Sequence, residues 1–232
     1  MRVPPIAKTN RFFFAWMVLA LLTASLYAQT RADVNLGPLE KLIEKQRNLH
    51  SLYVEFEQER KLRALRKPIS ASGKIWMAKE GKLFRMQTGE PPHSIVLKNG
   101  NGNTTIINTK KKTAEIVGPN RKFGSRSDKM GEMIQHLFPR SMDDLQKNFH
   151  ILSVEKAGEN WEAVLEPIEP EIARYLRQFI LRISKSGDTL AGFSLLLKDQ
   201  SVITSRTTRS LKNPNIPAEV FSPVLSGYKI KK

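Results

Sequence analysis

The sequence predicts a mainly β protein, an unclosed antiparallel β half-barrel with a helical lid over an apolar cavity. Short segments of alternating apolar and polar residues recur along the chain, separated by turns rich in Gly, Asn and Pro. A sheet of about ten such strands curls or closes to protect its edges. Helical apolar spacing near the start of the mature chain and over 128–149 supplies helices that can cover one sheet face.

The first 32 residues have the pattern of an export signal. Three basic residues precede an unbroken apolar run from Phe12 to Leu22, and small residues follow. The run, extended to about 15 residues, is shorter than the roughly 20 needed to span a bilayer, which favours a cleaved signal over a retained anchor. Cleavage is expected after Ala28 or after Ala32, and the mature protein is expected in the periplasm.

The composition is strongly basic and lacks cysteine. The chain has 38 Lys and Arg against 22 Asp and Glu, a net charge of +16. Removal of residues 1–28 takes away three basic residues and leaves +13. In an exported protein this excess suits anionic lipid headgroups, lipopolysaccharide or an acidic protein face, while the alternative is a basic surface that only maintains solubility. Without Cys there is no disulfide, thiolate metal site, Cys nucleophile or lipidated Cys.

The first elements follow from the apolar spacing. An amphipathic helix is predicted from Gly37-Pro38 to 48–51, because its apolar residues recur every three or four positions. The period then changes to two, and Leu52, Val54, Phe56 and Gln58 form one face of a strand. Further strands are predicted over 69–78, 82–88, 93–98, 104–109 and 113–117.

Residues 118–149 interrupt the strands. A polar loop leads to a helix over 128–138, which Pro139 ends, and Ser141 begins a second short helix to about Phe149. Residues 167–178 form a short helix or loop, and the end from Asn213 is Pro-rich and then basic. We expect one domain over 33–225 with the lid at about 128–149, and a basic tail over 226–232. Strands are predicted over 150–156, 161–166, 179–184, 190–198 and 201–211.

Several segments resemble the LolA family, periplasmic carriers that move lipoproteins from the inner to the outer membrane. Each motif is weak alone, but their order and spacing span nearly the whole mature chain. The departures, such as Asn99-Gly100 in place of Asp-Gly and Met86 in place of an aromatic residue, allow a divergent paralogue. The resembling segments are Leu49–Gln58, Ser72–Trp76, Gly81–Met86, Pro91–Gly100, Trp161–Pro167 and Asn213–Pro223.

The resemblance implies a fold and a set of site residues. The family fold is an unclosed antiparallel barrel whose helical lid covers a cavity for acyl chains. By analogy, Arg85 is a latch that bonds to lid carbonyls, and the alternative is an ordinary outward-facing strand Arg. Lid residues are expected to be Met130, Met133, Ile134, Leu137 and Phe138.

The cavity lining is expected to come from the apolar faces of the strands. A register error of one residue would exchange the two faces, and ordinary core packing is the alternative role for each residue. The predicted lining residues are Val54, Phe56, Ile75, Phe84, Met86, Val96, Ile106, Val164, Leu165 and Leu195.

Catalysis is not indicated. The four His residues are scattered without metal-ligand spacing, and no hydrolase or metalloprotease motif occurs, so we expect no enzyme, cofactor or metal.

The leading hypothesis is a monomeric carrier of lipoprotein acyl chains or another lipid, and it predicts no nucleic-acid partner. The resemblance implies an inner-membrane ABC-type release complex and an outer-membrane acceptor, with transient contact to an anionic membrane surface. The alternatives are a lipoprotein-binding sensor, a carrier for another glycolipid or secretion cluster, and a basic protein that binds lipopolysaccharide or nucleic acid.

Overall fold

The computed structural model describes residues 34–79, 81–118, 139 and 141–231. The predicted signal peptide over 1–32 and the predicted lid helix over 128–138 lie outside the described residues. Among the described residues, no helix combines the length and apolar character that crossing a membrane requires.

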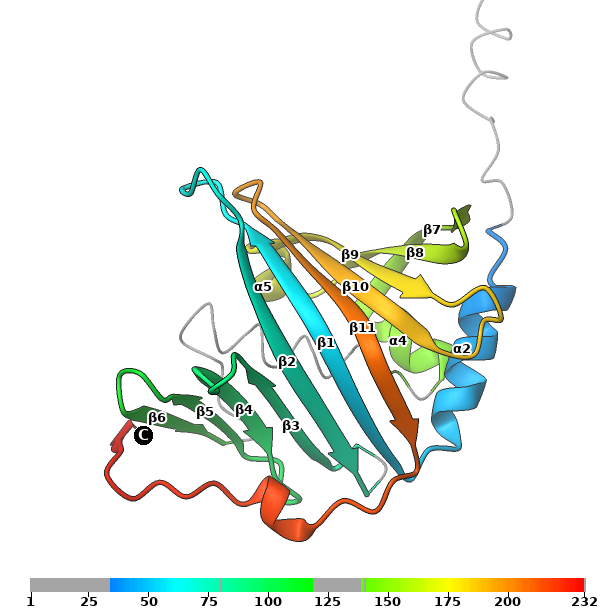
Figure 1. The fold of residues 1–232 in the computed structure, drawn as a ribbon. Coiled ribbons are helices and arrows are strands. Elements are labelled where there is room, and N and C mark those ends of the chain that lie inside the picture. Colours follow the sequence, from blue (N-terminus) through cyan, green and yellow to red (C-terminus); the bar gives the residue numbers. More distant parts are fainter. Residues whose placement is uncertain (1–33, 80, 119–138, 140, 232) are drawn as a thin grey trace, which may run out of the picture. The chain divides into compact units, whose positions relative to one another are not determined.

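The described residues form one open sheet of twelve strands, with β12 and β7 at its two edges. Its order is β12-β6-β5-β4-β3-β2-β1-β11-β10-β9-β8-β7, so two meanders are joined where β1 pairs with β11 (Figure 1). Every neighbouring pair is antiparallel except β12 and β6. The predicted class, an antiparallel sheet that does not close into a barrel, is confirmed.

The strand bounds follow the alternation in the sequence closely. The largest differences are β9, which begins three residues before its predicted start, and β12, which was not predicted. The first meander comprises β1 Ser51–Lys61, β2 Ile69–Ala78, β3 Leu83–Thr88, β4 Ser94–Lys98, β5 Thr104–Asn108 and β6 Thr113–Val117. The second comprises β7 Phe149–Ala157, β8 Asn160–Pro167, β9 Leu176–Ile183, β10 Leu190–Leu197 and β11 Val202–Lys212, and the last strand is β12 Lys229–Lys231.

The described helices are short and stand at the points where the chain enters or leaves the sheet. Helix α2, Gly37–Arg47, begins with Pro38 in its first turn, where a missing N–H costs nothing. Helix α4, Met142–Asn148, begins at Ser141, whose side chain accepts a hydrogen bond from the backbone N–H of Asp144. The remaining helices are α5, Pro170–Ala173, and the 3₁₀ turn η1, Ala218–Phe221.

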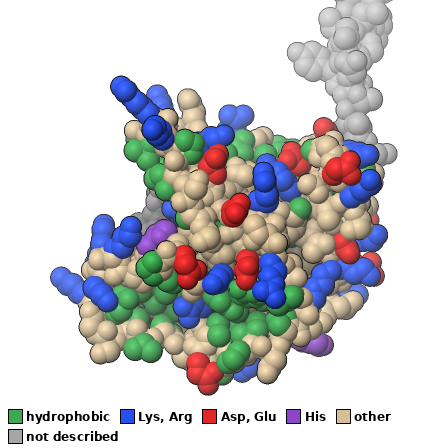
Figure 2. Space-filling view, viewed as in Figure 1, with side chains coloured by type: hydrophobic (Ala, Val, Ile, Leu, Met, Phe, Trp, Pro, Cys, Tyr) green, Lys and Arg blue, Asp and Glu red, His purple; other side chains and the backbone are tan. Residues whose placement is uncertain are grey.

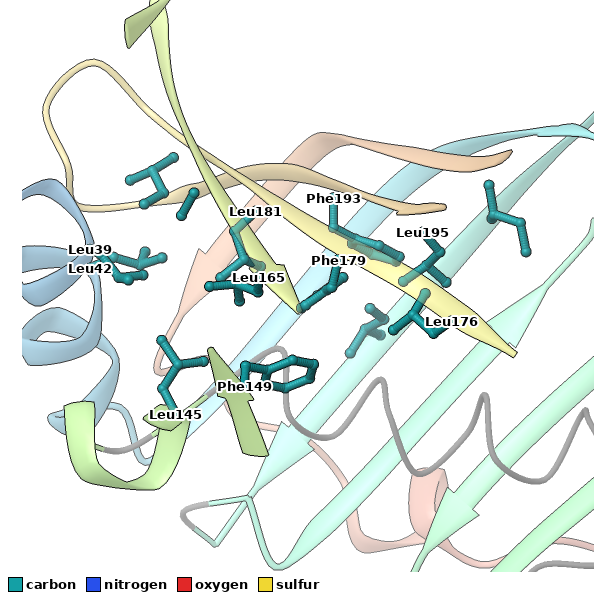
Figure 3. Close-up of a cluster of buried hydrophobic side chains, with 14 of the residues drawn as sticks. Leu39, Leu42, Leu145, Phe149, Leu165, Leu176, Phe179, Leu181, Phe193 and Leu195 are labelled. Carbon is teal, nitrogen blue, oxygen red and sulfur yellow. The ribbon is translucent and has the colours of Figure 1, made fainter. Parts of the chain in front are cut away.

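The main hydrophobic core lies on one face of the sheet, which we call the core face. Helix α2 contributes Leu39, Leu42 and Ile43, which are all buried, and these side chains pack toward the β7–β11 half of the sheet (Figure 3). Phe179 lies at the centre, with ring centroids 5.7 Å from Phe149 and 6.1 Å from Phe193. The opposite face is called the outer face.

The C-terminal segment returns to the first meander. Asn213 adopts a positive φ of 54° and its side chain accepts hydrogen bonds from the backbone N–H groups of His50 and Ser51. Further on, Leu225 and Tyr228 pack against a second small core on β4–β6, formed by Leu97, Ile107 and Ala114. Residues 229–231 therefore belong to the sheet, whereas the sequence pattern showed only a basic tail.

Candidate functional site

The predicted lining residues of the first meander form continuous rows on the core face. In one row, Val54 is the register partner of Ile75, Ile75 of Met86, Met86 of Val96, and Val96 of Ile106. Directly opposed residues in an antiparallel pair project to the same side. The row therefore crosses five strands as an unbroken apolar band.

The second meander continues this face. Leu165 opposes Phe179, which opposes Leu195, which in turn opposes Ile203 on β11. Val164 lies on the outer face, because successive strand residues point to opposite sides. Of the predicted lining residues on the core face, Ile106 is half-buried. The buried ones, all in the main core cluster, are Val54, Phe56, Ile75, Phe84, Met86, Val96, Leu165 and Leu195.

A small apolar cavity lined by described residues lies between α2 and the sheet. Its volume is about 30 Å³, and Leu42, Leu49, Val54, Phe56 and Ile75 are among the residues that line it. A space of that size holds about one water molecule. An acyl chain therefore enters here only if α2 or the facing side chains move away from the sheet. The predicted lid residues Met130, Met133, Ile134, Leu137 and Phe138 lie outside the described residues.

Arg85 lies on the outer face, on the other side of β3 from Phe84 and Met86. Its Nη1 donates to the backbone carbonyl of Val220 in η1 at 2.9 Å, and its Nη2 donates to Gln87 Oε1 at 3.1 Å. The guanidinium also lies 5.5 Å from the ring centroid of Trp76. Burial lowers the pKa of Arg85 below the usual Arg value. In the described residues, then, the carbonyl that Arg85 holds belongs to the C-terminal segment, and the predicted bond to lid carbonyls stays a prediction.

The core face becomes polar toward the far end of β1. Gln58 is buried, and Arg60, two residues further on the same face, is half-buried. The alternation of Leu52, Val54 and Phe56 continues to Arg60 in the sequence. This spacing could have placed Arg60 on the core face, but Arg60 was not among the predicted site residues.

The outer face of β1 is acidic and solvated. Figure 2 shows this side of the molecule, with acidic side chains near its middle and basic ones around them. The Glu55 carboxylate accepts a hydrogen bond from the Tyr53 hydroxyl at 2.7 Å and lies 3.7 Å from Arg209. Burial, together with this bond, raises the pKa of Tyr53 to about 12. An open hollow of about 630 Å³ lies beside these residues, lined mainly by polar side chains such as those of Glu57 and Glu59.

Metal ligands do not gather in the part of the chain that the structure describes. Within residues 34–79, 81–118, 139 and 141–231, no group of three or more His, Asp or Glu side chains is arranged to hold a metal ion.

Comparison with known proteins gives one family match. The family model described as outer membrane lipoprotein carrier protein LolA matches residues 47–224. No curated protein matches the chain in sequence.

Several solved structures resemble the fold at low sequence identity. An uncharacterized conserved protein from Thermus thermophilus has a TM-score of 0.49 and 8% identity, over 84% of this chain and 96% of that chain. A LolA superfamily protein from Nitrosomonas europaea has a TM-score of 0.42 and 10% identity, over 83% and 99%. The Mycobacterium tuberculosis lipoprotein LppX has a TM-score of 0.38 and 13% identity, over 78% and 96%.

Proposed function

Because this chain belongs to the LolA family of outer membrane lipoprotein carrier proteins, we propose that it is a periplasmic carrier that binds the acyl chains of a lipoprotein or another lipid. The observation that carries the proposal is the apolar band from Val54 to Ile106, which crosses five strands without a charged side chain. In this proposal the protein is monomeric and performs no catalysis. It receives cargo from an inner-membrane ABC-type complex and delivers it to an outer-membrane acceptor.

The energetics of burial support reversible carriage. Each buried methylene contributes about 0.8 kcal/mol, so even part of one acyl chain outweighs the loss of several side-chain contacts. Beside α2, the cavity that the described residues line is too small to hold an acyl chain. Loading must therefore separate packed groups, and the free energy of that separation lowers the net affinity and allows later release.

The carrier proposal is tested on two matched isoleucines. Ile106 and Ile116 are both half-buried and lie on the adjacent strands β5 and β6, but on opposite faces. We expect Ile106→Asp to weaken uptake of an apolar fluorescent dye at least about tenfold, because the carboxylate would enter the acyl-binding wall. Ile116→Asp serves as the control and should leave uptake unchanged. Native mass spectrometry of protein purified from periplasm would identify the bound lipid.

Two results would contradict this proposal. The first is wild-type protein that takes up no dye and retains no lipid. The second is equal loss of uptake in both variants while circular dichroism shows both to be folded.

Contact with a membrane is a further part of the proposal, and the β1–β2 hairpin tip is its surface. The tip spans residues 62–68 and carries Arg63, Arg66 and Lys67, which make no ion pair with any residue that the structure describes. Leu65 stands among them with 46% of its surface exposed. Clustered cations around an exposed apolar side chain fit the surface of an anionic phospholipid bilayer.

Vesicle sedimentation tests this surface. Each cation near an anionic surface contributes about 1 kcal/mol, so we expect the triple Gln variant of the tip cations to lose about 100-fold in affinity for phosphatidylglycerol-containing vesicles. The control replaces three exposed lysines elsewhere, Lys45, Lys82 and Lys156, with Gln. Equal losses in both variants would show a nonspecific effect of net charge. If the tip variant keeps its affinity for the vesicles, the hairpin tip is not the membrane-binding surface. If the wild type binds nucleic acid more tightly than vesicles, its partner is not a membrane.

A further inference from the structure

The apolar core face ends in a half-buried cation. Arg60 follows Val54, Phe56 and Gln58 on the same face of β1, and its register partners are Ile203 on β11 and Ile69 on β2. Phe56 and Arg60 are four residues apart on one strand, a separation of about 13 Å. A guanidinium therefore stands at the far end of the surface proposed to bind acyl chains.

The orientation of Arg60 is fixed by a chain of hydrogen bonds. Its Nε donates to Gln58 Oε1 at 2.6 Å, and Gln58 Nε2 donates to Ser205 Oγ at 3.1 Å. Gln58 and Ser205 are both buried. The two terminal nitrogens of Arg60 make no hydrogen bond or ion pair with the residues that the structure describes, so they keep their donors for another acceptor.

Other basic side chains lie near Arg60. Burial, and then the charges of Arg60 and Lys110, lower the pKa of His93, so both cations lie close enough to His93 to act on its protonation. Burial also lowers the pKa of Arg60 itself. Among the residues that the structure describes, this desolvated cation has no acidic partner, which is costly. An anion bound to the two terminal nitrogens of Arg60 would remove that cost.

We infer that the ligand of the core face is an acyl lipid with an anionic headgroup, whose phosphate or carboxylate binds Arg60 while its chain lies along Gln58 and Phe56. The inference rests on the proposed carrier function and specifies the class of cargo. A planar guanidinium binds two oxygens of a carboxylate or phosphate at once, which a lysine at the same position would not do.

The test compares lipids that share a chain and differ in headgroup charge. Oleate is paired with its neutral methyl ester, and phosphatidylglycerol with diacylglycerol, in displacement of a fluorescent apolar probe. We expect Arg60→Gln to weaken both anionic lipids about tenfold and to change the affinity for both neutral lipids less than twofold. Loss confined to oleate or to phosphatidylglycerol would identify the headgroup as a carboxylate or a phosphate, and Arg60→Lys should show an intermediate loss.

Arg206→Gln is the matched control, because Arg206 is exposed on the outer face of the neighbouring strand β11. It should bind all four lipids as the wild type does. The inference is overturned if Arg60→Gln weakens anionic and neutral lipids equally, or weakens neither. If none of the four lipids binds even the wild type, the carrier function fails as well, so the two failures are distinguishable.

Discussion

The contact between Phe56 and Gly73 gives a stringent test of how the core face is built. The two residues are register partners on β1 and β2, and the Phe56 ring lies over the backbone of Gly73. A Cβ atom added at Gly73 would lie 2.1 Å from Phe56 Cζ and 2.7 Å from the backbone oxygen of Gln87. Gly73→Ala therefore forces the Phe56 ring to move. The added Cβ also lies too close to the backbone oxygen of Gln87, which cannot move away as a side chain can.

The magnitude follows from opposing effects. Overpacking a core costs about 1–3 kcal/mol, while replacing Gly with Ala restricts the unfolded chain and returns about 0.4–1 kcal/mol. We expect Gly73→Ala to lower the free energy of unfolding by about 1–2 kcal/mol. Phe56→Ala should cost about 3–5 kcal/mol by itself, because it leaves a cavity.

A double-mutant cycle separates the ring from the backbone. In the Phe56→Ala background the clash with the ring is gone and only the Gln87 oxygen remains, so Gly73→Ala should cost about 1 kcal/mol less there. Urea unfolding at about 25 °C measures all four proteins. Gly100→Ala is the control, because the nearest atom to its added Cβ is Leu83 Cδ2 at 3.9 Å, and it should be near neutral. Additive costs at Phe56 and Gly73 would refute the packing described for this face.

Three further changes test other parts of the structure. Arg85→Leu removes a charged hydrogen bond to Val220 worth about 1.5–3 kcal/mol, and should speed amide exchange in the C-terminal segment, as read by mass spectrometry. The folded-state pKa of His93 is lowered, so the stability of the wild type is full above about pH 6.5 and falls as the pH drops below that value. In His93→Gln, the urea concentration at the unfolding midpoint should change less between about pH 8 and 5.5 than it does in the wild type. Ser141→Ala removes the side-chain oxygen that accepts the hydrogen bond from the Asp144 N–H, and should lower the free energy of unfolding by about 1 kcal/mol in thermal or urea unfolding. An unchanged free energy of unfolding would contradict this role of Ser141.

Much of the core face was predictable because its signal is local. The alternation through Val54 and Phe56 identifies one side of a strand without knowledge of its neighbours, and burial on that side follows. Val164 and Leu165, both predicted as lining residues, show where local spacing stops being sufficient. Adjacent strand residues face opposite ways, and only the pairing of Leu165 with Phe179 selects which of them enters the core.

Other features depend on residues far apart in the chain. Arg85 meets Val220, 135 positions later, and the alternation around Arg85 contains no information about that carbonyl. The short strand Lys229–Lys231 is stabilised by parallel pairing with β6 rather than by its own basic sequence. An edge strand this short has too little local preference to be recognised without its partner.

The sequence by itself determined nearly all the described strands of this protein, its family, and the apolar character of one side of most strands, because these depend on spacing within a few residues and on ordered motifs. The tertiary structure decided which strands are neighbours, which side chains share a row, and where the charges border that row. Those properties depend on register between distant segments, and it is register that places Arg60 beside Ile203 and gives the apolar face a cationic end.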